Sequence, residues 1–535
     1  MPAKKMSSHS NTHQNTKYKR QHCSLFPPEL EIQINFRSKI DMEMILISIC
    51  LSTLVAFLYL KPFLKRRTTT NLNPPPSPWR LPVLGNLHQL SLHPHRSLGS
   101  LSLRYGPLML LHFGRVPILV VSSADTAHDV MKTHDLKVSN RPKTKVIDKL
   151  FNGGTDVAFS PYGEYWRQMK SICVLNLLTK KTIRSFENIR EEEINIMLDK
   201  LEKASSSSSR VNLSELLTTL TNDVITRIVL GRKYSSEEGG NNSKNIVRRF
   251  MELLGAFPLG EYVPSLAWID RIRGQDKKVE EIHNEIDGFL EKVVQEHVDA
   301  DEPKSDFVDI LLSTQRDKTT TFELDRSGLK IIVLDMLLGG SSTTFTLVEW
   351  TMTELMRHPE CMKKLQDEIR SVSMDNLYVS EKEVEKMNYL NMVIKEVLRL
   401  HPPTPLIPRM LTENVKLNEY DIAAGTHVII NLWAIQRDSV TWGLDAEEFK
   451  PERHLDSNLN FEGQNFNFIP FGSGRRLCPG SRLALAMAEV TLANLVNRFD
   501  WRVEANPLGD DLLEATGLDV CRKFPLIVFP SSNST

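Results

Sequence analysis

The sequence lacks the cysteine pairs that a zinc site or a disulfide framework requires. Its 535 residues include 6 cysteines. No two of them form a C-x-x-C pair, and they stand far apart, at Cys23, Cys50, Cys173, Cys361, Cys478 and Cys521. This spacing argues against structural zinc and against a disulfide scaffold. A cysteine in unusual surroundings must therefore have another use.

The chain also lacks an excess of charge of either sign. It has 66 Lys and Arg residues against 66 Asp and Glu residues. Nucleic-acid-binding proteins usually carry a basic excess, so we expect no nucleic-acid partner. Internal repeats are missing as well, which argues against solenoids and propellers. With 41% hydrophobic and 25% charged residues, the composition is that of a globular protein with a sizeable core.

Charge is missing entirely from segment 44–60, MILISICLSTLVAFLYL. Its length just reaches across the hydrocarbon core of a bilayer, which predicts a transmembrane anchor. A cleavable signal peptide is the alternative, but the apolar run is long for one and no small-x-small cleavage pattern follows it. Lys61, Lys65, Arg66 and Arg67 come directly after the span. By the positive-inside tendency they favour a cytosolic body.

The segments on either side of the anchor are interpreted as an extension and a linker. Several basic residues within 1–41 oppose the predicted orientation. Our hypothesis is that 1–41 is a disordered upstream extension and that translation normally begins at Met42 or Met44. Segment 61–78 is basic and contains three consecutive prolines, which favour an extended and semi-rigid spacer. The body, 79–535, shows no clear linker and is predicted to be one large domain.

The pattern of the body predicts a mainly α fold with minor β structure. The apolar, β-branched stretch 107–123 predicts a hairpin. Most of 165–296 has a helical pattern, with loops expected at the serine run 205–209 and at 237–243. Helices are expected to dominate again from 329 to 400, with 329–358 as one long helix, and short strands with irregular structure are expected from 400 to Gly480.

One short stretch, FGSGRRLCPG at 471–480, explains the lone cysteine. Its glycines allow tight turns that aim backbone N–H groups at sulfur, and Arg476 offers a fork for a carboxylate. A helical pattern follows, so Cys478 lies near a helix N-terminus, where a thiolate is stabilised. A thiolate beside an arginine that binds carboxylates indicates haem, whose iron takes the sulfur and whose propionates take the arginine.

This stretch resembles the F-x-x-G-x-R-x-C-x-G signature of the cytochrome P450 superfamily at Phe471, Gly474, Arg476, Cys478 and Gly480. The resemblance extends from about residue 45 to the C-terminus and is greatest to plant family 71, subfamily A. It implies the cytochrome P450 fold, a single large haem domain behind an anchor in the endoplasmic reticulum membrane, facing the cytosol. It also implies haem b with an axial thiolate from Cys478, and contacts to the cofactor from Phe471, Gly472, Arg476 and Gly480.

Three charged residues resemble the Glu-Arg-Arg network of that family. Glu396 and Arg399 in KEVLRLHPP match its E-x-x-R pair, and Arg453 in FKPERH matches the third member. Residues at i and i+3 share a helix face and can form an ion pair. A surface salt bridge is the alternative for so common a spacing. His454 stands where many members have phenylalanine, which changes the local packing.

The resemblance implies further contacts to the haem. Trp166 in GEYWRQMK matches a tryptophan that meets a propionate, and Lys170 stands where an arginine is usual. Lysine keeps the charge but loses the planar fork, so Arg167 is an alternative for this contact. Arg409 in PLIPRM is another candidate for a propionate.

The long helix departs from the family pattern at one position. In LDMLLGGSSTTFT, Gly339, Gly340 and Thr343 match Ala/Gly-Gly-x-Asp/Glu-Thr-Thr, but Ser342 replaces the acid. Two glycines inside a helix cost about 1 kcal/mol each, so another group is expected to approach the backbone there. A serine is a poor proton source, and general acid help is worth about a hundredfold to ten-thousandfold. Thr343 and Ser342 are the predicted catalytic residues.

Three functions remain open. The first is a monooxygenase that oxidises a small lipophilic plant secondary metabolite, with electrons from NADPH through a reductase that docks near Arg475, Lys170 and Arg167. The second is a dehydratase that converts an aldoxime, such as indole-3-acetaldoxime, to a nitrile. Members of the subfamily with this activity have a similar acid-free stretch. The third is a haem sensor without catalysis, against which the glycine pair and Thr343 argue.

By resemblance, the substrate is expected to meet an apolar pocket with few polar anchors. Its walls are predicted to come from 151–159, from Leu337, Leu338 and Phe345 on the long helix, from 404–407 and from 516–518.

Overall fold

The structure is a computed structural model that describes residues 44–54, 56–57, 73–234, 240–301, 306–316, 324–374, 376–504 and 512–533. The chain divides into two compact units, Met1–Asn71 and Leu72–Thr535, and the second is called the body below. Within the first unit, an apolar helix covers Met44–Leu54. The predicted extension 1–41, the end of the predicted anchor at 58–60 and most of the linker lie outside the described residues.

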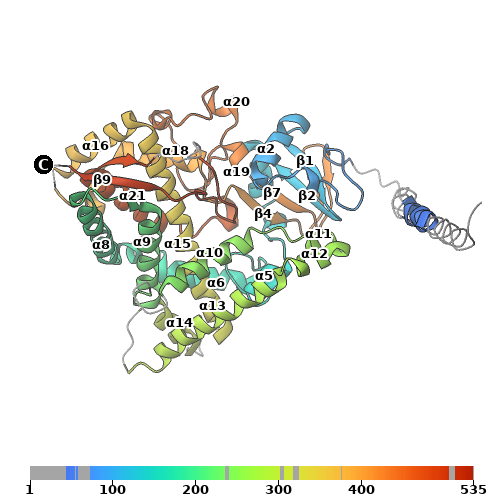
Figure 1. Ribbon diagram of the computed structural model, residues 1–535, viewed down its shortest axis with the longest axis horizontal. Coiled ribbons are helices and arrows are strands. Elements are labelled where there is room, and N and C mark those ends of the chain that lie inside the picture. Colours follow the sequence, from blue (N-terminus) through green and yellow to red (C-terminus); the bar gives the residue numbers. More distant parts are fainter. Residues whose placement is uncertain are drawn as a thin grey trace, which may run out of the picture. The chain divides into compact units, whose positions relative to one another are not determined.

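The body is mainly helical and carries three small sheets (Figure 1). Its helices are α2 (Pro94–Tyr105), α3 (Ala124–His128), α4 (Asp135–Val138), α5 (Lys145–Leu150), α6 (Glu164–Leu177), α7 (Lys180–Ser185), α8 (Glu187–Ser206), α9 (Leu213–Leu230), α10 (Gly240–Leu254), α11 (Leu259–Tyr262), α12 (Ala267–Ile272), α13 (Gln275–Val298), α14 (Phe307–Arg316), α15 (Arg326–Arg357), α16 (Pro359–Ser373), α17 (Glu381–Val384), α18 (Asn388–Leu400), α19 (Leu432–Ile435), α20 (Ser439–Trp442) and α21 (Ser481–Arg498). Short 3₁₀ or π segments are η1 (Leu87–Gln89), η2 (Asp129–Thr133), η3 (Pro264–Leu266), η4 (Pro451–His454) and η5 (Gly474–Arg476). The strands are β1 (Leu108–Phe113), β2 (Val116–Val121), β3 (Val211–Asn212), β4 (Leu406–Met410), β5 (Val415–Leu417), β6 (Tyr420–Ile422), β7 (His427–Asn431), β8 (Phe499–Val503) and β9 (Ile527–Ser532).

The largest sheet has the order β1-β2-β7-β4 and lies at one end of the body, beside α2 and α19 (Figure 1). β1 and β2 form the predicted hairpin, antiparallel from Leu108 opposite Val121 to Phe113 opposite Val116. β7 then pairs with β2 in parallel and with β4 antiparallel. Side chains alternate across β4, so Ile407 and Arg409 are buried on one face of it. This alternation brings both side chains to the cavity described below.

Helix α15 forms the centre of the helical part and packs against α9, α18 and α21 (Figure 1). The Asp325 side chain caps its first turn by accepting a hydrogen bond from Gly328 N at 2.8 Å. The helix therefore begins three residues before the predicted start at 329. Among the described residues it is the helix long and apolar enough to cross a membrane, but most of it is buried in the body. Its hydrophobicity is thus that of a core helix.

The two loops predicted in the helical part differ from the structure in their bounds. α8 continues to Ser206, where the Ser206 hydroxyl donates to Glu202 O at 3.0 Å and helps to close the last turn. The predicted loop at 205–209 is therefore shorter than expected. α10 begins at Gly240, inside the predicted loop 237–243, and 235–239 lie outside the described residues.

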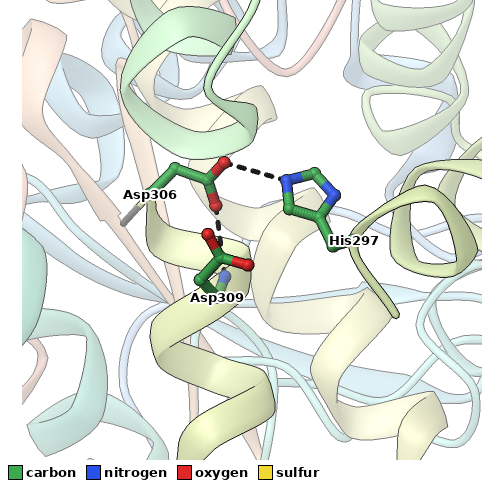
Figure 2. Close-up of side chains that lie close together, drawn as sticks. All are labelled: His297, Asp306 and Asp309. Carbon is green, nitrogen blue, oxygen red and sulfur yellow. Dashed lines mark hydrogen bonds and ion pairs between the residues drawn. The ribbon is translucent and has the colours of Figure 1, made fainter. Parts of the chain in front are cut away.

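A buried ion pair joins the end of α13 to the start of α14 (Figure 2). His297 Nε2 lies 2.8 Å from Asp306 Oδ2, and its Nδ1 donates to Val293 O at 2.7 Å. The ring is thus engaged at both nitrogens as an imidazolium. His297, Asp306 and Asp309 together have donor atoms that could bind a cation. Both nitrogens of His297 are already hydrogen-bonded, however, so the ion pair with Asp306 accounts for the arrangement. Gly231, at φ 70° after α9, permits the approach, because a Cβ there would lie 2.4 Å from Asp306 Oδ2.

We expect this ion pair to make stability depend on pH. Burial opposes the charged ring, but the hydrogen bonds to Asp306 and Val293 outweigh it and raise the pKa of His297. A raised histidine pKa stabilises the fold fully below the unfolded value and loses that contribution as pH rises through the folded value. Asp306→Asn should therefore destabilise the protein most near about pH 6 and least above about pH 8. Urea unfolding of the haem-loaded protein measures this difference. The same pH profile for Asp306→Asn and wild type would contradict it, and Asp276→Asn, exposed on α13, is the control.

Candidate active site

An apolar cavity of about 340 Å³ lies between α15 and the loop that carries Cys478. Its walls come from segments that are far apart in the sequence: the loop before α6, α6 itself, α9, α10, α15, the turn before β4, the cysteine loop and the C-terminal segment. Of the predicted cofactor-binding residues it is lined by Phe471, Gly472, Arg476, Cys478, Gly480, Trp166, Lys170, Arg409, Gly339 and Gly340. The sequence prediction for this set is therefore consistent with the geometry.

The cysteine loop is shaped by glycines and by backbone hydrogen bonds. Cys478 N donates to Phe471 O at 3.0 Å, which closes the loop around the thiol. Gly472 and Gly474 have φ values of 76° and 69°, which glycine adopts without strain. A Cβ on Gly474 would also lie 2.6 Å from Met131 O. Gly480 is the N-cap of α21, so Cys478 lies two residues before the helix, as predicted.

The Cys478 thiol is exposed to the cavity and enclosed by its walls. Removal from water raises its pKa, whereas the backbone N–H groups of Gly480 and Ser481 and the cations Lys170 and Arg141 act in the opposite direction. The environment therefore combines a dry site with several groups that favour negative charge on sulfur. A metal ion at this position would complete the deprotonation.

Three guanidinium groups meet at the cavity: Arg141, Arg409 and Arg476. Arg409 and Arg476 are only 3% and 7% exposed. Burial lowers the pKa of Arg409, and the charges of Arg141 and Arg476 lower it further. Among the described residues none of the three forms a salt bridge with a carboxylate, and Arg141 Nε is buried without a hydrogen-bond partner.

Asp156, Asp335 and Asp135 act on these guanidinium groups only from beyond salt-bridge distance, so the cluster fits a group with two carboxylates. Haem has two propionates, and the cavity offers them this cluster opposite a thiol that suits its iron. The residues present therefore fit haem. The sequence prediction missed Arg141, because NRP after a helical stretch is typical of a turn. Only the folded chain brings it next to Arg409.

Two predicted cofactor contacts have other partners in the protein. Trp166 Nε1 donates to Val157 O at 2.9 Å. The Arg476 guanidinium donates to Ser139 O at 2.8 Å, to Val157 O and to Ser160 O. It also lies 4.4 Å from the centre of the Trp166 ring. Both side chains thus line the cavity while they fix the loop before α6, and Arg476 is not the free fork that the sequence predicted.

The two adjacent glycines of α15 serve different purposes. A Cβ on Gly340 would lie 2.5 Å from Ile225 Cδ1 of α9, so a second helix approaches the backbone, as predicted. A Cβ on Gly339 would meet nothing within 4 Å and would project into the cavity. Thr343, one turn further, lines the cavity as well, and its hydroxyl donates to Gly339 O at 2.7 Å. Glycine at 339 therefore leaves room for a bound group beside this hydroxyl.

Ser342 differs from the prediction, because it does not line the cavity. Its hydroxyl instead donates to Asp519 Oδ2 in the C-terminal segment. Successive residues of a helix point about 100° apart, which explains why Thr343 faces the cavity and Ser342 faces its neighbour. The sequence prediction missed Asp519.

The predicted substrate walls are partly correct. The cavity is lined by Phe151, Val157, Ala158, Phe159, Leu338, Thr404, Ile407 and Leu518. Leu337 and Phe345 were also predicted to line it, but they lie on another face of α15 and pack into the core. Helix periodicity accounts for the error, since 335, 339, 343 and 347 share the face toward the cavity.

Two acids at the cavity were also missed: Asp335, which lines it, and Asp156 in the loop before α6. Asp335 Oδ2 accepts a hydrogen bond from Val157 N at 2.6 Å, and Asp156 Oδ2 accepts one from Phe159 N at 2.8 Å. Burial and then the charge of Asp156 raise the pKa of Asp335, and burial raises the pKa of Asp156 to about 6. They hold the loop 151–159 against α15.

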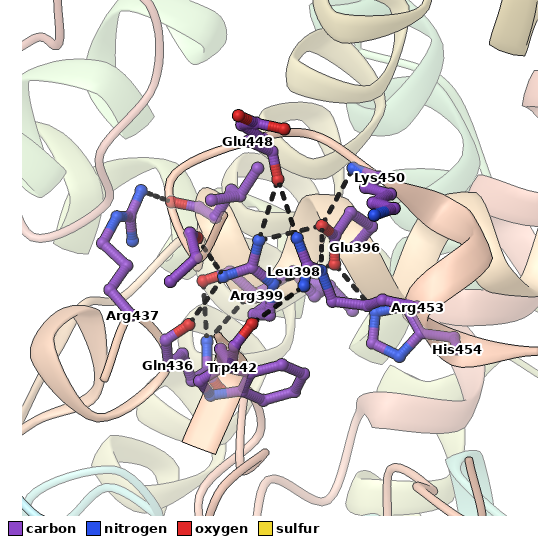
Figure 3. A network of polar contacts seen from close by, with 12 residues as sticks. Glu396, Leu398, Arg399, Gln436, Arg437, Trp442, Glu448, Lys450, Arg453 and His454 are labelled. Atoms are coloured by element: carbon purple, nitrogen blue, oxygen red, sulfur yellow. Dashed lines mark hydrogen bonds and ion pairs between the residues drawn. The ribbon is translucent and has the colours of Figure 1, made fainter. Parts of the chain in front are cut away.

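Glu396, Arg399 and Arg453 form one buried network (Figure 3). Arg399 Nε and Nη2 each lie 2.8 Å from the Glu396 carboxylate, and Arg453 Nε lies 2.9 Å from it. His454 donates from Nε2 to the same carboxylate at 2.9 Å. Arg399 also donates to backbone oxygens of Gln436, Ala446 and Glu448. The network therefore fixes the chain that leads to the cysteine loop.

Electrostatics explains why histidine is accepted at 454. Burial raises the pKa of Glu396, but the hydrogen bonds from Arg399 and His454 and the charge of Arg399 outweigh it and hold the pKa at about 2. Burial lowers the pKa of His454. A neutral ring donates one hydrogen bond to the carboxylate and leaves its buried Nδ1 without a partner. It adds a donor that phenylalanine would not have.

Arg167, Lys170 and Arg475, the cations predicted to attract the reductase, lie in or beside the cysteine loop. The guanidinium groups of Arg167 and Arg475 lie 5.9 and 5.4 Å from the ring centre of Tyr162. Lys170 Nζ donates to Arg475 O at 2.9 Å. Arg167 pairs with Glu164 and Arg475 with Asp135, so two of the three charges are partly balanced.

Three features of the cavity define a haem-thiolate protein. They are the Cys478 thiol, a cluster of cations suited to propionates, and a helix that presents a glycine and a threonine at the cavity wall. The model of the family Cytochrome P450 matches residues 74–516. The chain therefore belongs to the cytochrome P450 family and is an enzyme that contains haem, with Cys478 as the axial thiolate ligand.

Curated relatives show which members of the family this chain resembles. The three named below are all from Arabidopsis thaliana. Cytochrome P450 71A14 is 65% identical over 495 residues, which are 92% of this chain and 100% of the relative. Indoleacetaldoxime dehydratase and Cytochrome P450 71A20 are each 66% identical, over 92% of this chain and 100% of theirs. A solved zebra fish cytochrome P450 with abiraterone shares the fold with a TM-score of 0.70 and 25% identity, over 82% of this chain and 100% of that one.

Proposed function

We propose that the protein is a monooxygenase that oxidises a small lipophilic plant metabolite with dioxygen and two electrons. The observation that carries this proposal is the position of Thr343, which lines the same cavity as Cys478 and whose hydroxyl donates to Gly339 O at 2.7 Å. Bound haem supplies the iron at which dioxygen is activated. A hydroxyl at the cavity wall serves proton delivery in such a reaction, whereas a haem sensor would not need it.

The protein groups have distinct tasks in this reaction. Cys478 holds the haem by its sulfur, and Arg141, Arg409 and Arg476 neutralise the propionates. Phe151, Leu338 and similar side chains exclude water and bind the lipophilic substrate. The Thr343 hydroxyl places a proton donor at the cavity wall. Glu396 and its arginines do not touch the cavity and keep the cysteine loop in position.

The electrons come from NADPH through a reductase. We propose that this partner docks on the side of Arg167, Lys170 and Arg475, where a local patch can attract an acidic protein despite the neutral overall charge. We further propose that 44–60 anchors the chain in the endoplasmic reticulum membrane with the body in the cytosol. The apolar helix Met44–Leu54 and the basic residues after the span support this orientation.

The second candidate function is an aldoxime dehydratase. Two observations favour it: a relative with 66% identity is named Indoleacetaldoxime dehydratase, and Ser342 replaces the acid that dioxygen cleavage usually needs. The dehydration of an aldoxime to a nitrile consumes no dioxygen and no electrons in total. The hydroxyl takes up a proton, which Thr343 can supply, and leaves as water. The proton on the oxime carbon is lost as the nitrile forms and returns to Thr343, so no proton is consumed in total.

Dioxygen uptake separates the two functions. Purified protein with reductase and NADPH is assayed with indole and with indole-3-acetaldoxime as probes. We expect uptake of dioxygen in step with an oxygenated product from indole. Nitrile from the aldoxime without dioxygen uptake, together with no oxygenated product, would overturn the monooxygenase and establish the dehydratase. A shift of the haem absorption band on titration with each probe shows which molecule enters the cavity.

A further inference from the structure

The serine that replaces the helix acid has a carboxylate as its partner. Ser342 Oγ donates to Asp519 Oδ2, although the two residues are 177 positions apart. Backbone hydrogen bonds fix the C-terminal segment here: Val520 N donates to Pro403 O at 2.8 Å, and Leu518 N donates to Met251 O at 3.2 Å. Asp519 is thus held beside α15 by contacts on both sides of it.

Asp519 is buried, and among the described residues no cation pairs with it. It is 7% exposed. The titratable groups that face it are Glu252 of α10, Glu349 of α15 and Cys521 of its own segment. Arg522 acts on Glu349. Burial raises the pKa of Asp519, and Glu252 adds to the effect against the hydrogen bond from Ser342. A carboxylic acid in such surroundings retains its proton to higher pH than an exposed one.

The Ser342–Asp519 pair lies directly behind the cavity wall. Thr343 follows Ser342 and lines the cavity, and Leu518 precedes Asp519 and lines it as well. Glu252, on the other side, has a half-exposed side chain. The acid is therefore placed between solvent and the hydroxyl that faces the substrate.

We propose that Asp519 is the acid that α15 lacks at position 342, a proton-relay residue that acts through Ser342. The proposal rests on the monooxygenase function. In the relay, Asp519 Oδ2 gives its proton to Ser342 Oγ, while the hydroxyl proton of Ser342 passes through water to the Thr343 side of the cavity. Asp519 is left as a carboxylate and takes a new proton from solvent on the side of Glu252. One proton enters and one leaves.

The overall reaction consumes that proton. Substrate, dioxygen, NADPH and one proton give the hydroxylated product, water and NADP⁺. Hydrogen peroxide brings both oxygen atoms, both protons and both electrons, so substrate and peroxide alone give product and water. The relay is needed with dioxygen and is bypassed with peroxide, which provides a specific test.

The first variant is Asp519→Asn. Asparagine keeps an oxygen acceptor for Ser342 and loses the transferable proton. In the haem-loaded full chain with reductase and indole, we expect the dioxygen-driven rate to fall about a hundredfold, with loss of its pH dependence, and the peroxide-driven rate to stay at the wild-type value. Equal falls in both assays would show a structural role and overturn the proposal. So would wild-type rates in both.

Further variants separate the relay from folding defects. Ser342→Ala should give the same pattern, and the double variant with Asp519→Asn should lose nothing more, because both act in one path. Ser342→Asp places two carboxyl groups in contact and should not increase the rate. The exchange of both residues, Ser342→Asp with Asp519→Ser, returns an acid to the pair and should restore most of the wild-type dioxygen-driven rate. Dioxygen-driven rates at the wild-type value in Ser342→Ala would overturn the relay.

An infrared measurement tests the acid without turnover. We expect a carbonyl band of a protonated carboxyl group in the resting haem-loaded protein, missing in Asp519→Asn and shifted in Ser342→Ala. If indole is not oxidised by wild type in either assay, the monooxygenase function fails, and this band still tests the state of Asp519. Absence of the band at every pH above about 5 would overturn the proposal.

Discussion

Replacing Glu396 with alanine is expected to prevent recovery of haem-loaded protein. The change leaves Arg399, which is 0% exposed, and Arg453 without their shared carboxylate. Removal of one partner from a buried ion pair costs about 3–5 kcal/mol, because the remaining charge stays uncompensated. This is a large part of the stability of a typical domain. The ratio of haem to protein after purification, and the midpoint of urea unfolding, measure the effect.

A matched surface variant controls for the loss of a glutamate. Glu385 forms an ion pair with Arg184, and both side chains are more than half exposed. Glu385→Ala should therefore change stability by no more than about 1 kcal/mol and leave the haem content intact. A normal haem spectrum and an unchanged unfolding midpoint in Glu396→Ala would contradict the assignment of the network.

Acid should weaken the same network. The pKa of Glu396 is lowered to about 2 in the folded protein. A carboxyl group with a lowered folded pKa stabilises the fold above its unfolded value and loses that contribution as pH falls toward the folded value. The stability that Glu396 provides is therefore complete above about pH 5 and is lost between about pH 5 and pH 2.

Replacing Cys478 with serine is expected to abolish activity and to change the haem spectrum. A hydroxyl stays protonated where a thiol becomes a thiolate, so the sulfur ligand and the electron density it gives to iron are both lost. The reduced protein with carbon monoxide should no longer absorb at the wavelength diagnostic of thiolate ligation. The absorption spectrum and the rate with indole measure the two effects.

Another buried cysteine provides the control for this variant. Cys361 lies on α16, is 4% exposed and does not line the cavity. Cys361→Ala should keep the carbon monoxide spectrum and the rate of the parent. If Cys478→Ser gave the parent spectrum as well, the haem would have another axial ligand, and the central assignment would be wrong.

The sequence predicted those parts of the site that depend on local pattern. The turn glycines around Cys478, the i and i+3 spacing of Glu396 and Arg399, and the long helix with Gly340 inside it are local features. The folded chain shows each of them where the pattern placed it, with the start of the helix shifted by three residues.

The parts that could not be predicted depend on contacts between distant segments. Arg141 joins Arg409 only when β4 lies beside the loop before α5, and Asp519 meets Ser342 only when the C-terminal segment crosses α15. Leu337 and Phe345 were assigned to the cavity, together with Leu338, by resemblance to the family. The phase of the helix, which the sequence alone did not fix, turns them into the core.

The cavity has a floor and a roof of different origin. The cysteine loop and the arginines form the floor, and their backbone is fixed by glycines and by buried charge. The roof comes from loop 151–159, α10 and Leu518, which meet mainly through apolar side chains. Side chains of the roof can be exchanged without disturbing the cofactor. Substitutions in the roof can therefore change which substrate fits while the residues that hold the haem stay the same.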